Sequence, residues 1–140
     1  MVKNLAHLPK EDQIHKESNF QNQNYLKFLQ ENQTAYDKLP REHKILVLAG
    51  IFDGEGSFGV WSRGQKRKKL LEVKVETTDA DMVARFHAMW GGIFYVTTPK
   101  KSKHRHLFRW KITGDRGWNC LQEMIPYMCS RRREKYYGLV

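Results

Sequence analysis

The sequence predicts an α+β domain in which helices cover one face of an antiparallel sheet. Segments that alternate between apolar and polar residues, as strands do, are separated by segments with helical periodicity, in the order α-β-β-α-β-β-α. Consecutive strands are joined by basic hairpin turns. With 140 residues, of which 40% are hydrophobic, the chain is long enough to enclose one core.

The first forty residues differ in composition from the rest. They are polar and rich in Asn and Gln, with one short amphipathic stretch at residues 25–29. Pro40 then marks a boundary. We therefore expect residues 1–40 to form a polar N-terminal extension and residues 41–140 to form the folded domain.

The first helix of the domain is expected to begin at Pro40 and to be apolar on almost every side. One helical stripe consists of Ile45, Leu48, Ala49 and Phe52. The remaining faces carry Leu46, Val47, Gly50 and Ile51. A chain of this size rarely surrounds such a helix by itself, so a second copy of the helix could supply the missing cover. Ala49 and Gly50 are small enough to let two helix backbones approach closely. Gly54 and Gly56 are expected to end the helix.

Four strands are predicted by their alternating pattern. The first two cover residues 58–63 and 70–76, and the second pair covers residues 93–98 and 106–113. In each strand the apolar positions face the core and the polar positions face outward, so one face of the sheet is polar.

Three further helices complete the predicted domain. The first is capped at Thr78 or Asp79 and ends at the glycine pair of residues 91–92. The second begins near residue 114 and stops before Pro126. The third begins at residue 130 in a strongly basic segment.

The positive charge of the chain gathers on the polar sheet face and in the hairpin turns. The net charge is +10, and residues 41–140 carry the whole excess. The sheet face is expected to present Trp61, Arg63, Lys74, Arg109 and Lys111. The turns carry Lys66, Arg67, Lys68, Lys69, Lys100, Lys101, Lys103 and Arg105. A two-stranded ribbon fits the major groove of DNA, about 12 Å wide, so we expect these residues to bind double-stranded DNA. A basic surface that only promotes solubility explains the turns equally well.

Other classes of protein are disfavoured. There is no apolar run of the length that a membrane span needs, and the N-terminus lacks the pattern of a secretion signal. Cys120 and Cys129 fit neither a zinc site nor a disulfide framework. The sequence thus predicts an intracellular protein that does not enter membranes.

Residues 48–56, LAGIFDGEG, resemble the signature of the LAGLIDADG homing endonucleases. Six of nine positions agree when Glu55 is counted as the equivalent acid. The resemblance covers about residues 41–137. It implies the αββαββα fold of that family, with a saddle-shaped sheet that faces DNA and helices on the other face. Because the motif occurs once, the resemblance implies the homodimeric type.

The resemblance also assigns roles to individual residues. Glu55 would bind a divalent cation, Mg²⁺ or another such as Mn²⁺, beside the scissile phosphate, and the Gly54 carbonyl would help complete the metal site. By local register, Thr77 matches a polar position at the end of the second strand, and Arg131 matches a basic position in the last helical segment. Glutamine or asparagine, and lysine, are more usual at these two positions. The helix pair of the dimer would involve Leu48, Ala49, Gly50, Ile51 and Asp53, with Asp53 capping or supporting it.

These features together predict a site-specific DNA endonuclease that makes metal-dependent double-strand breaks at a long, partly palindromic site. The alternative is a nucleic-acid-binding protein of the same fold that does not cleave, such as an RNA maturase or a transcriptional regulator. A basic structural domain with a coincidental motif requires motif, element order and basic face all to be accidental.

Overall fold

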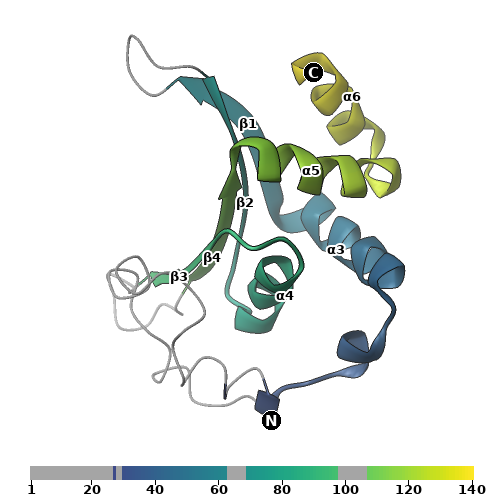
Figure 1. The fold of residues 1–140 in the computed structure, drawn as a ribbon, viewed down its shortest axis with the longest axis vertical. Helices are drawn as coiled ribbons and strands as arrows, with labels where there is room; N and C mark the ends of the chain where they lie inside the picture. Colours follow the sequence, from purple (N-terminus) through teal and green to yellow (C-terminus); the bar gives the residue numbers. More distant parts are fainter. Residues whose placement is uncertain (1–26, 28–29, 63–68, 98–106) are drawn as a thin grey trace. The chain divides into compact units, whose positions relative to one another are not determined.

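The computed structural model describes residues 27, 30–62, 69–97 and 107–140 and confirms the α+β fold class (Figure 1). Its helices are α3 (Arg41–Glu55), α4 (Ala80–Trp90), α5 (Gly114–Met124) and α6 (Ser130–Leu139), with short 3-10 turns η2 (Ala35–Lys38) and η3 (Ile125–Tyr127). Its strands are β1 (Gly56–Ser62), β2 (Lys69–Thr77), β3 (Ile93–Thr97) and β4 (Leu107–Thr113). The strands form one antiparallel sheet in the order β1-β2-β4-β3. Among the described residues, no helix combines the length and apolar character needed to cross a membrane.

The chain divides into two compact units. One contains residues up to Leu39 together with Glu76–Trp110, and the other contains Pro40–Val75 together with Lys111–Val140. Strands β2 and β4 therefore contribute to both units. The predicted division of the chain at residue 40 into an extension and a domain stays a prediction.

Helix α3 buries the predicted apolar stripe within its own unit. Ile45 is 6% exposed, and the other three stripe residues are fully buried. Pro40 is the N-cap of α3, since its carbonyl accepts hydrogen bonds from the amides of His43 and Lys44. We had expected Gly54 and Gly56 to end the helix. Gly54 is still helical, because α3 continues to Glu55, and the following Gly56 is the C-cap.

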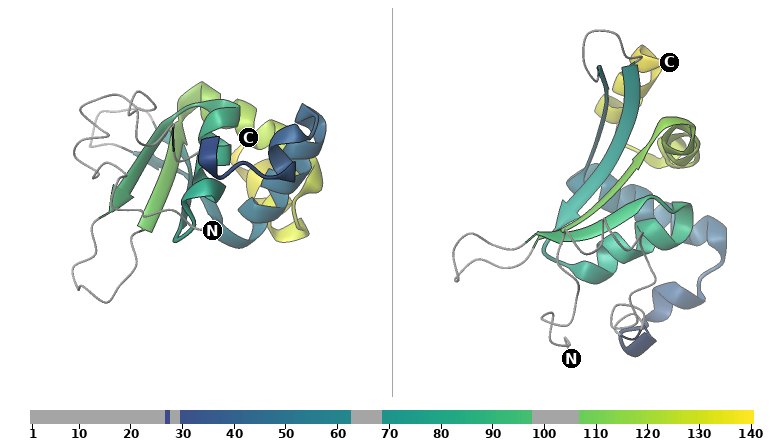
Figure 2. Two further views of the ribbon diagram at one scale, coloured as in Figure 1. Left: turned by 90° about the horizontal axis from the view of Figure 1, so that it is seen from below. Right: turned by 60° about the vertical axis from the view of Figure 1, so that its left-hand side comes forward.

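Strands β1 and β2 pair as a long antiparallel ribbon (Figure 2). In its register, Gly56 lies opposite Val75 and Ser62 lies opposite Lys69. Burial alternates along β2 as predicted, so that Leu71 and Val73 are buried while Glu72 is only half-buried. Helix α5 packs on the apolar face: a Cβ at Gly117 would lie 3.2 Å from Leu71 and 3.4 Å from Val73. The polar face of the ribbon is thus the face opposite α5.

In the other unit, α4 packs against β3 and β4 through aromatic side chains. The rings of Phe86 and Trp110 lie 5.1 Å apart, and both residues are fully buried. The indole Nε1 of Trp110 donates to the Gly91 carbonyl at 2.6 Å, so the polar atom of this buried ring is satisfied. Asp79 is the N-cap residue of α4, one of the two positions predicted.

The N-terminal turn η2 also belongs to this unit and contacts α4. The guanidinium of Arg85 lies 4.3 Å from the centre of the Tyr36 ring and donates to the Thr34 hydroxyl at 3.2 Å. Burial raises the pKa of Tyr36 to about 12, although the nearby positive charge of Arg85 lowers it. The described residues just before Pro40 therefore pack on α4.

Replacing Gly56 by alanine tests the junction of α3 and β1. A Cβ at Gly56 would lie 2.2 Å from the fully buried Phe52 ring, so that the ring or the backbone must move. We expect Gly56→Ala to lower the free energy of unfolding by about 1–3 kcal/mol, as overpacking does. Gly138→Ala is the control, because a Cβ at Gly138 meets nothing within 4 Å. It should raise stability by about 0.5–1 kcal/mol. Equal stability of the two variants in urea unfolding would contradict the packing at Gly56.

Candidate active site

The end of α3 presents a carboxylate to solvent. Glu55 is the last residue of the helix, and its side chain is exposed. Gly54 is also exposed, and a Cβ at Gly54 would meet nothing within 4 Å. No basic residue occupies the last turn of α3, although the partial negative charge of a helix C-terminus favours one. An acid at this end makes the junction between α3 and β1 a negative site, and a cation can neutralise it.

Asp53 holds the beginning of α6 against the end of α3. Both oxygens of its carboxylate accept from the backbone amide of Cys129, at 3.1 and 3.2 Å. Cys129 is the N-cap position of α6, where the helix amides lack partners within the helix. Asp53 therefore caps α6 within one chain, and its predicted role in the helix pair stays a prediction.

Two cations of α6 contact the backbone around this junction. Arg132 donates from Nη2 to the Asp53 carbonyl at 3.3 Å, and Lys135 donates from Nζ to the Phe58 carbonyl at 2.5 Å. Arg132 also lies over the Phe52 ring at 5.3 Å, and Lys135 over the Phe58 ring at 4.8 Å. The Nε of Arg132 is buried without a hydrogen-bond partner among the described residues. Positive charge is therefore built into the side of the junction that α6 covers.

The two other predicted catalytic residues have different surroundings. Arg131 is exposed in the first turn of α6, one residue after Ser130. Thr77 is 9% exposed at the end of β2, and its hydroxyl accepts from the Asp79 amide at 3.2 Å. Thr77 belongs to the other compact unit and has a local structural role at the start of α4.

The donors at the junction suit a hard cation. The Glu55 carboxylate and the Gly54 carbonyl are oxygen donors of the kind that Mg²⁺ prefers. Within the described residues, His, Cys, Asp and Glu side chains form no group of three that could hold a metal ion. Burial raises the pKa of the Cys120 thiol well above its ordinary value, which makes it a poor metal ligand. The described residues of one chain thus offer only part of a Mg²⁺ coordination sphere at this junction.

The predicted helix-pair residues divide between the core and the surface. Leu48 and Ala49, which we expected in the interface, are fully buried because they pack in the core of their own unit. Gly50 is exposed, and a Cβ there would meet nothing within 4 Å. Leu46 and Val47 are 45% and 37% exposed. The open apolar side of α3 therefore centres on Gly50, with Ile51 half-buried beside it.

The polar face of the β1–β2 ribbon carries both charge and an aromatic ring. Trp61 is 50% exposed near the end of β1. Lys74 is half-buried on this face. Lys69 is exposed at the start of β2, but side chains alternate along the strand, so it shares the face of Leu71 and Val73. Lys111, in the same unit, lies 3.8 Å from the carboxylate of Glu72. The charge of Lys111 is therefore partly compensated.

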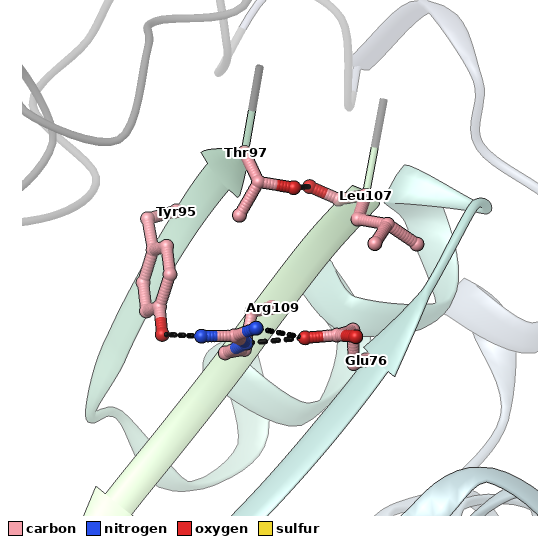
Figure 3. A network of polar contacts seen from close by, with 5 residues as sticks. All are labelled: Glu76, Tyr95, Thr97, Leu107 and Arg109. Carbon is pink, nitrogen blue, oxygen red and sulfur yellow. Dashed lines mark hydrogen bonds and ion pairs between the residues drawn. The ribbon is translucent and has the colours of Figure 1, made fainter. Parts of the chain in front are cut away.

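Arg109 is held by neighbours on the polar face of its own unit (Figure 3). It donates from Nε to Glu76 at 2.5 Å and from Nη1 to the Tyr95 hydroxyl at 2.7 Å, and Nη2 also pairs with Glu76. Partial burial lowers the pKa of Arg109, but the hydrogen bonds to Tyr95 and Glu76 outweigh it and raise the pKa above its usual value. The guanidinium stays charged, and Glu76 offsets that charge.

The remaining predicted DNA contacts lie outside the described residues. They are Arg63, Lys66, Arg67, Lys68, Lys100, Lys101, Lys103 and Arg105.

The positions of Arg132 and Lys135 at the junction were not predicted from the sequence. These residues are three apart, a spacing that places both on one face of a helix. That spacing was available in the sequence, but which face of α6 meets α3 was not. Glu76 was likewise missed as the partner of Arg109, because the two are 33 residues apart in the chain.

Comparisons with known proteins give similarity in structure alone. No family model matches the sequence, and no curated protein matches it. The group I intron-encoded homing endonuclease I-CeuI, complexed with DNA, matches over 98% of this chain and 72% of that chain, with 15% sequence identity and a TM-score of 0.55. The LAGLIDADG homing endonuclease I-SmaMI, bound to cleaved DNA, matches over 66% of this chain and 29% of that chain, with 21% identity and a TM-score of 0.38.

A third solved structure, the archaeal intron-encoded homing endonuclease I-Vdi141I complexed with DNA, matches over 63% of this chain and 55% of that chain, with 13% identity and a TM-score of 0.39. Of these three structures, I-CeuI alone has a TM-score that supports a common fold. Together with the element order and the sheet, this match shows that this chain has the α+β fold of the homing endonuclease I-CeuI.

Proposed function

We propose that the protein is a site-specific DNA endonuclease that works as a homodimer with a divalent cation. The observation that carries this proposal is the exposed Glu55 at the end of α3, the helix end whose Asp53 caps the basic start of α6. An acid alone would repel a phosphate, and cations alone would bind one without reaction. Their combination at one junction suits phosphodiester hydrolysis.

The cations of α6 would hold the DNA backbone near the acid. Arg131 is exposed and can reach a phosphate in solution, and its charge would stabilise the additional negative charge of the transition state. Arg132 and Lys135 donate hydrogen bonds to backbone carbonyls. Their proposed role is therefore to hold α6 against the end of α3 and the start of β1.

Glu55 and the Gly54 carbonyl would hold Mg²⁺ or Mn²⁺. Such an ion neutralises phosphate charge, lowers the pKa of bound water and stabilises the leaving oxygen. Thr77 remains our candidate for orienting water, although its hydroxyl already accepts one hydrogen bond from the chain.

A second copy of the chain would complete the site. One motif provides one exposed acid, and cutting both strands of a duplex requires two sites related by a two-fold axis. The open side of α3 supports this arrangement, because Leu46 and Val47 are exposed and Gly50 leaves room for a close neighbour. Such an assembly fits a partly palindromic target.

The polar sheet face would contact the duplex. Lys74 and Lys111 lie on the face opposite α5 and suit phosphate or base contacts. Lys69, exposed at the start of β2, would hold a phosphate at the hairpin end of the ribbon. Arg109 remains a proposed DNA-contacting residue. Because it is paired with Glu76, it would act as a hydrogen-bond donor in a fixed position and would attract phosphate only weakly.

Replacing Glu55 by glutamine tests the proposed chemistry. Glu55→Gln keeps the shape of an exposed side chain and removes its charge, so folding and DNA binding should be retained. Magnesium-dependent cleavage should fall by at least about a hundredfold, since a charged metal ligand is lost. The control is Glu42→Gln, which removes one exposed acid from the first turn of the same helix.

The measurement uses a library of long duplexes with magnesium, in which any double-strand breaks are mapped, and a parallel sample with a chelator. Cleavage by Glu55→Gln at the unmodified rate would refute the metal assignment. Sequence-specific binding by the unmodified protein without any break would instead favour the non-cleaving binder of the same fold.

Enlarging Gly50 tests the proposed dimer. Gly50→Gln should fold normally, because a Cβ there meets nothing within 4 Å, and glutamine is a good helix former. It should weaken dimerisation at least about tenfold, because packed helices lie only about 8–10 Å apart and the longer side chain holds them away from each other. Gly138→Gln, on an equally open position of α6, should leave dimerisation unchanged. Sedimentation with and without DNA measures both variants, and a purely monomeric unmodified protein in both samples would exclude the dimer.

A further inference from the structure

The indole of Trp61 lies across Gly59 on the polar face of the β1–β2 ribbon. A Cβ at Gly59 would lie 2.8 Å from Cη2 of Trp61, and 3.1 and 3.2 Å from two more atoms of the same ring. Gly59 is buried although it is on the polar face of the strand, because this ring covers it. The indole therefore lies along the sheet, and its outer side accounts for the 50% exposure of Trp61.

The residues next to this ring on the polar face are mixed in character. Trp61 pairs with Leu70, and Gly59 under the ring pairs with Glu72. Lys111 lies 3.8 Å from the Glu72 carboxylate and offsets its charge. In the sequence, residues 63–68, which lie outside the described residues, add four basic residues and no acid. The net positive charge of the segment that forms the ribbon thus favours a polyanion as partner, and the flat ring suits an apolar group on that polyanion.

We propose that Trp61 determines sequence specificity by contacting the C5-methyl group of a thymine in the major groove. Thymine is the base that presents a methyl group at that edge, next to hydrogen-bonding atoms common to other bases. The outer face of an indole offers a broad apolar surface for such a methyl group. Gly59 sets the height of the ring above the sheet. The inference rests on the proposed DNA-binding function and adds the base that one residue recognises.

The experiment removes the methyl group from the DNA. A duplex site is first selected from a random library with the Glu55→Gln protein, so that bound DNA stays intact. Each thymine of that site is then replaced by deoxyuridine, which differs only by the missing methyl group, and affinity is measured at constant salt. We expect about a fourfold loss of affinity at one thymine position in each half-site, the value for burial of one methyl-sized group.

Two variants in the same Glu55→Gln background connect that position to the indole. Trp61→Ala should bind the thymine and deoxyuridine sites equally. Gly59→Ala should lift the ring off the sheet and should also reduce the difference between the two sites, while Trp61 itself remains. Gly138→Ala is the matched control and should keep the fourfold difference, because a Cβ there meets nothing within 4 Å. Thermal unfolding verifies that all variants are folded.

The outcomes separate this inference from the proposed function. Absence of any sensitive thymine, or the same deoxyuridine penalty in Trp61→Ala, overturns the methyl contact while site-specific DNA binding stands. A loss in Trp61→Ala that is equal for all sequences shows a non-specific contact and also overturns it. Failure of the Glu55→Gln protein to bind any duplex overturns the DNA-binding function and this inference with it. Binding by the unmodified protein without cleavage leaves the contact supported and refutes only the nuclease activity.

Discussion

The absence of a side chain at Gly56 is the constraint on which the candidate active site depends. The ring of Phe52 occupies the space that a Cβ at Gly56 would need, with three ring atoms between 2.2 and 2.5 Å from it. The same ring stacks on Phe58 with centroids 6.1 Å apart. Helix α3 and strand β1 therefore meet over one buried aromatic pair. The bend between them keeps Glu55 outside the core, where its carboxylate is exposed.

The two helix ends at this junction carry charges that oppose their own dipoles. Acids stand at the C-terminal end of α3, and three arginines begin α6, where acids are normally favoured. Charges that oppose a helix dipole are electrostatically unfavourable. Part of this unfavourable energy is offset locally, because the Asp53 carboxylate accepts a hydrogen bond from the Cys129 amide at the start of α6. Departures from local preference of this kind concentrate at functional sites. The arrangement thus supports the proposal that the junction binds a cation and a phosphate.

The polar sheet face is less positive than its basic residues suggest. In each compact unit, a basic residue of β4 pairs with a glutamate of β2: Lys111 with Glu72, and Arg109 with Glu76. Within the described part of that face, Lys74 forms no ion pair and is the better candidate for attraction of phosphate. Pairing also fixes the direction of the Arg109 guanidinium, a property that favours recognition of defined acceptors over general attraction.

The sequence by itself determined the element order, the alternation of β2, the buried stripe of α3 and the position of Glu55 at a helix end, because all of these depend on residues close together in the chain. It did not determine which side of α3 stays exposed or which side of α6 is covered. Leu48 and Ala49 were expected at an interface and lie in the core, while Arg132 and Lys135 were not expected at the junction and lie there. The pairing of Arg109 with Glu76 and the cover of Gly59 by Trp61 were also decided only by the tertiary structure. These features depend on the rotation of packed helices and on which groups face each other across the sheet, and local periodicity carries no information about either.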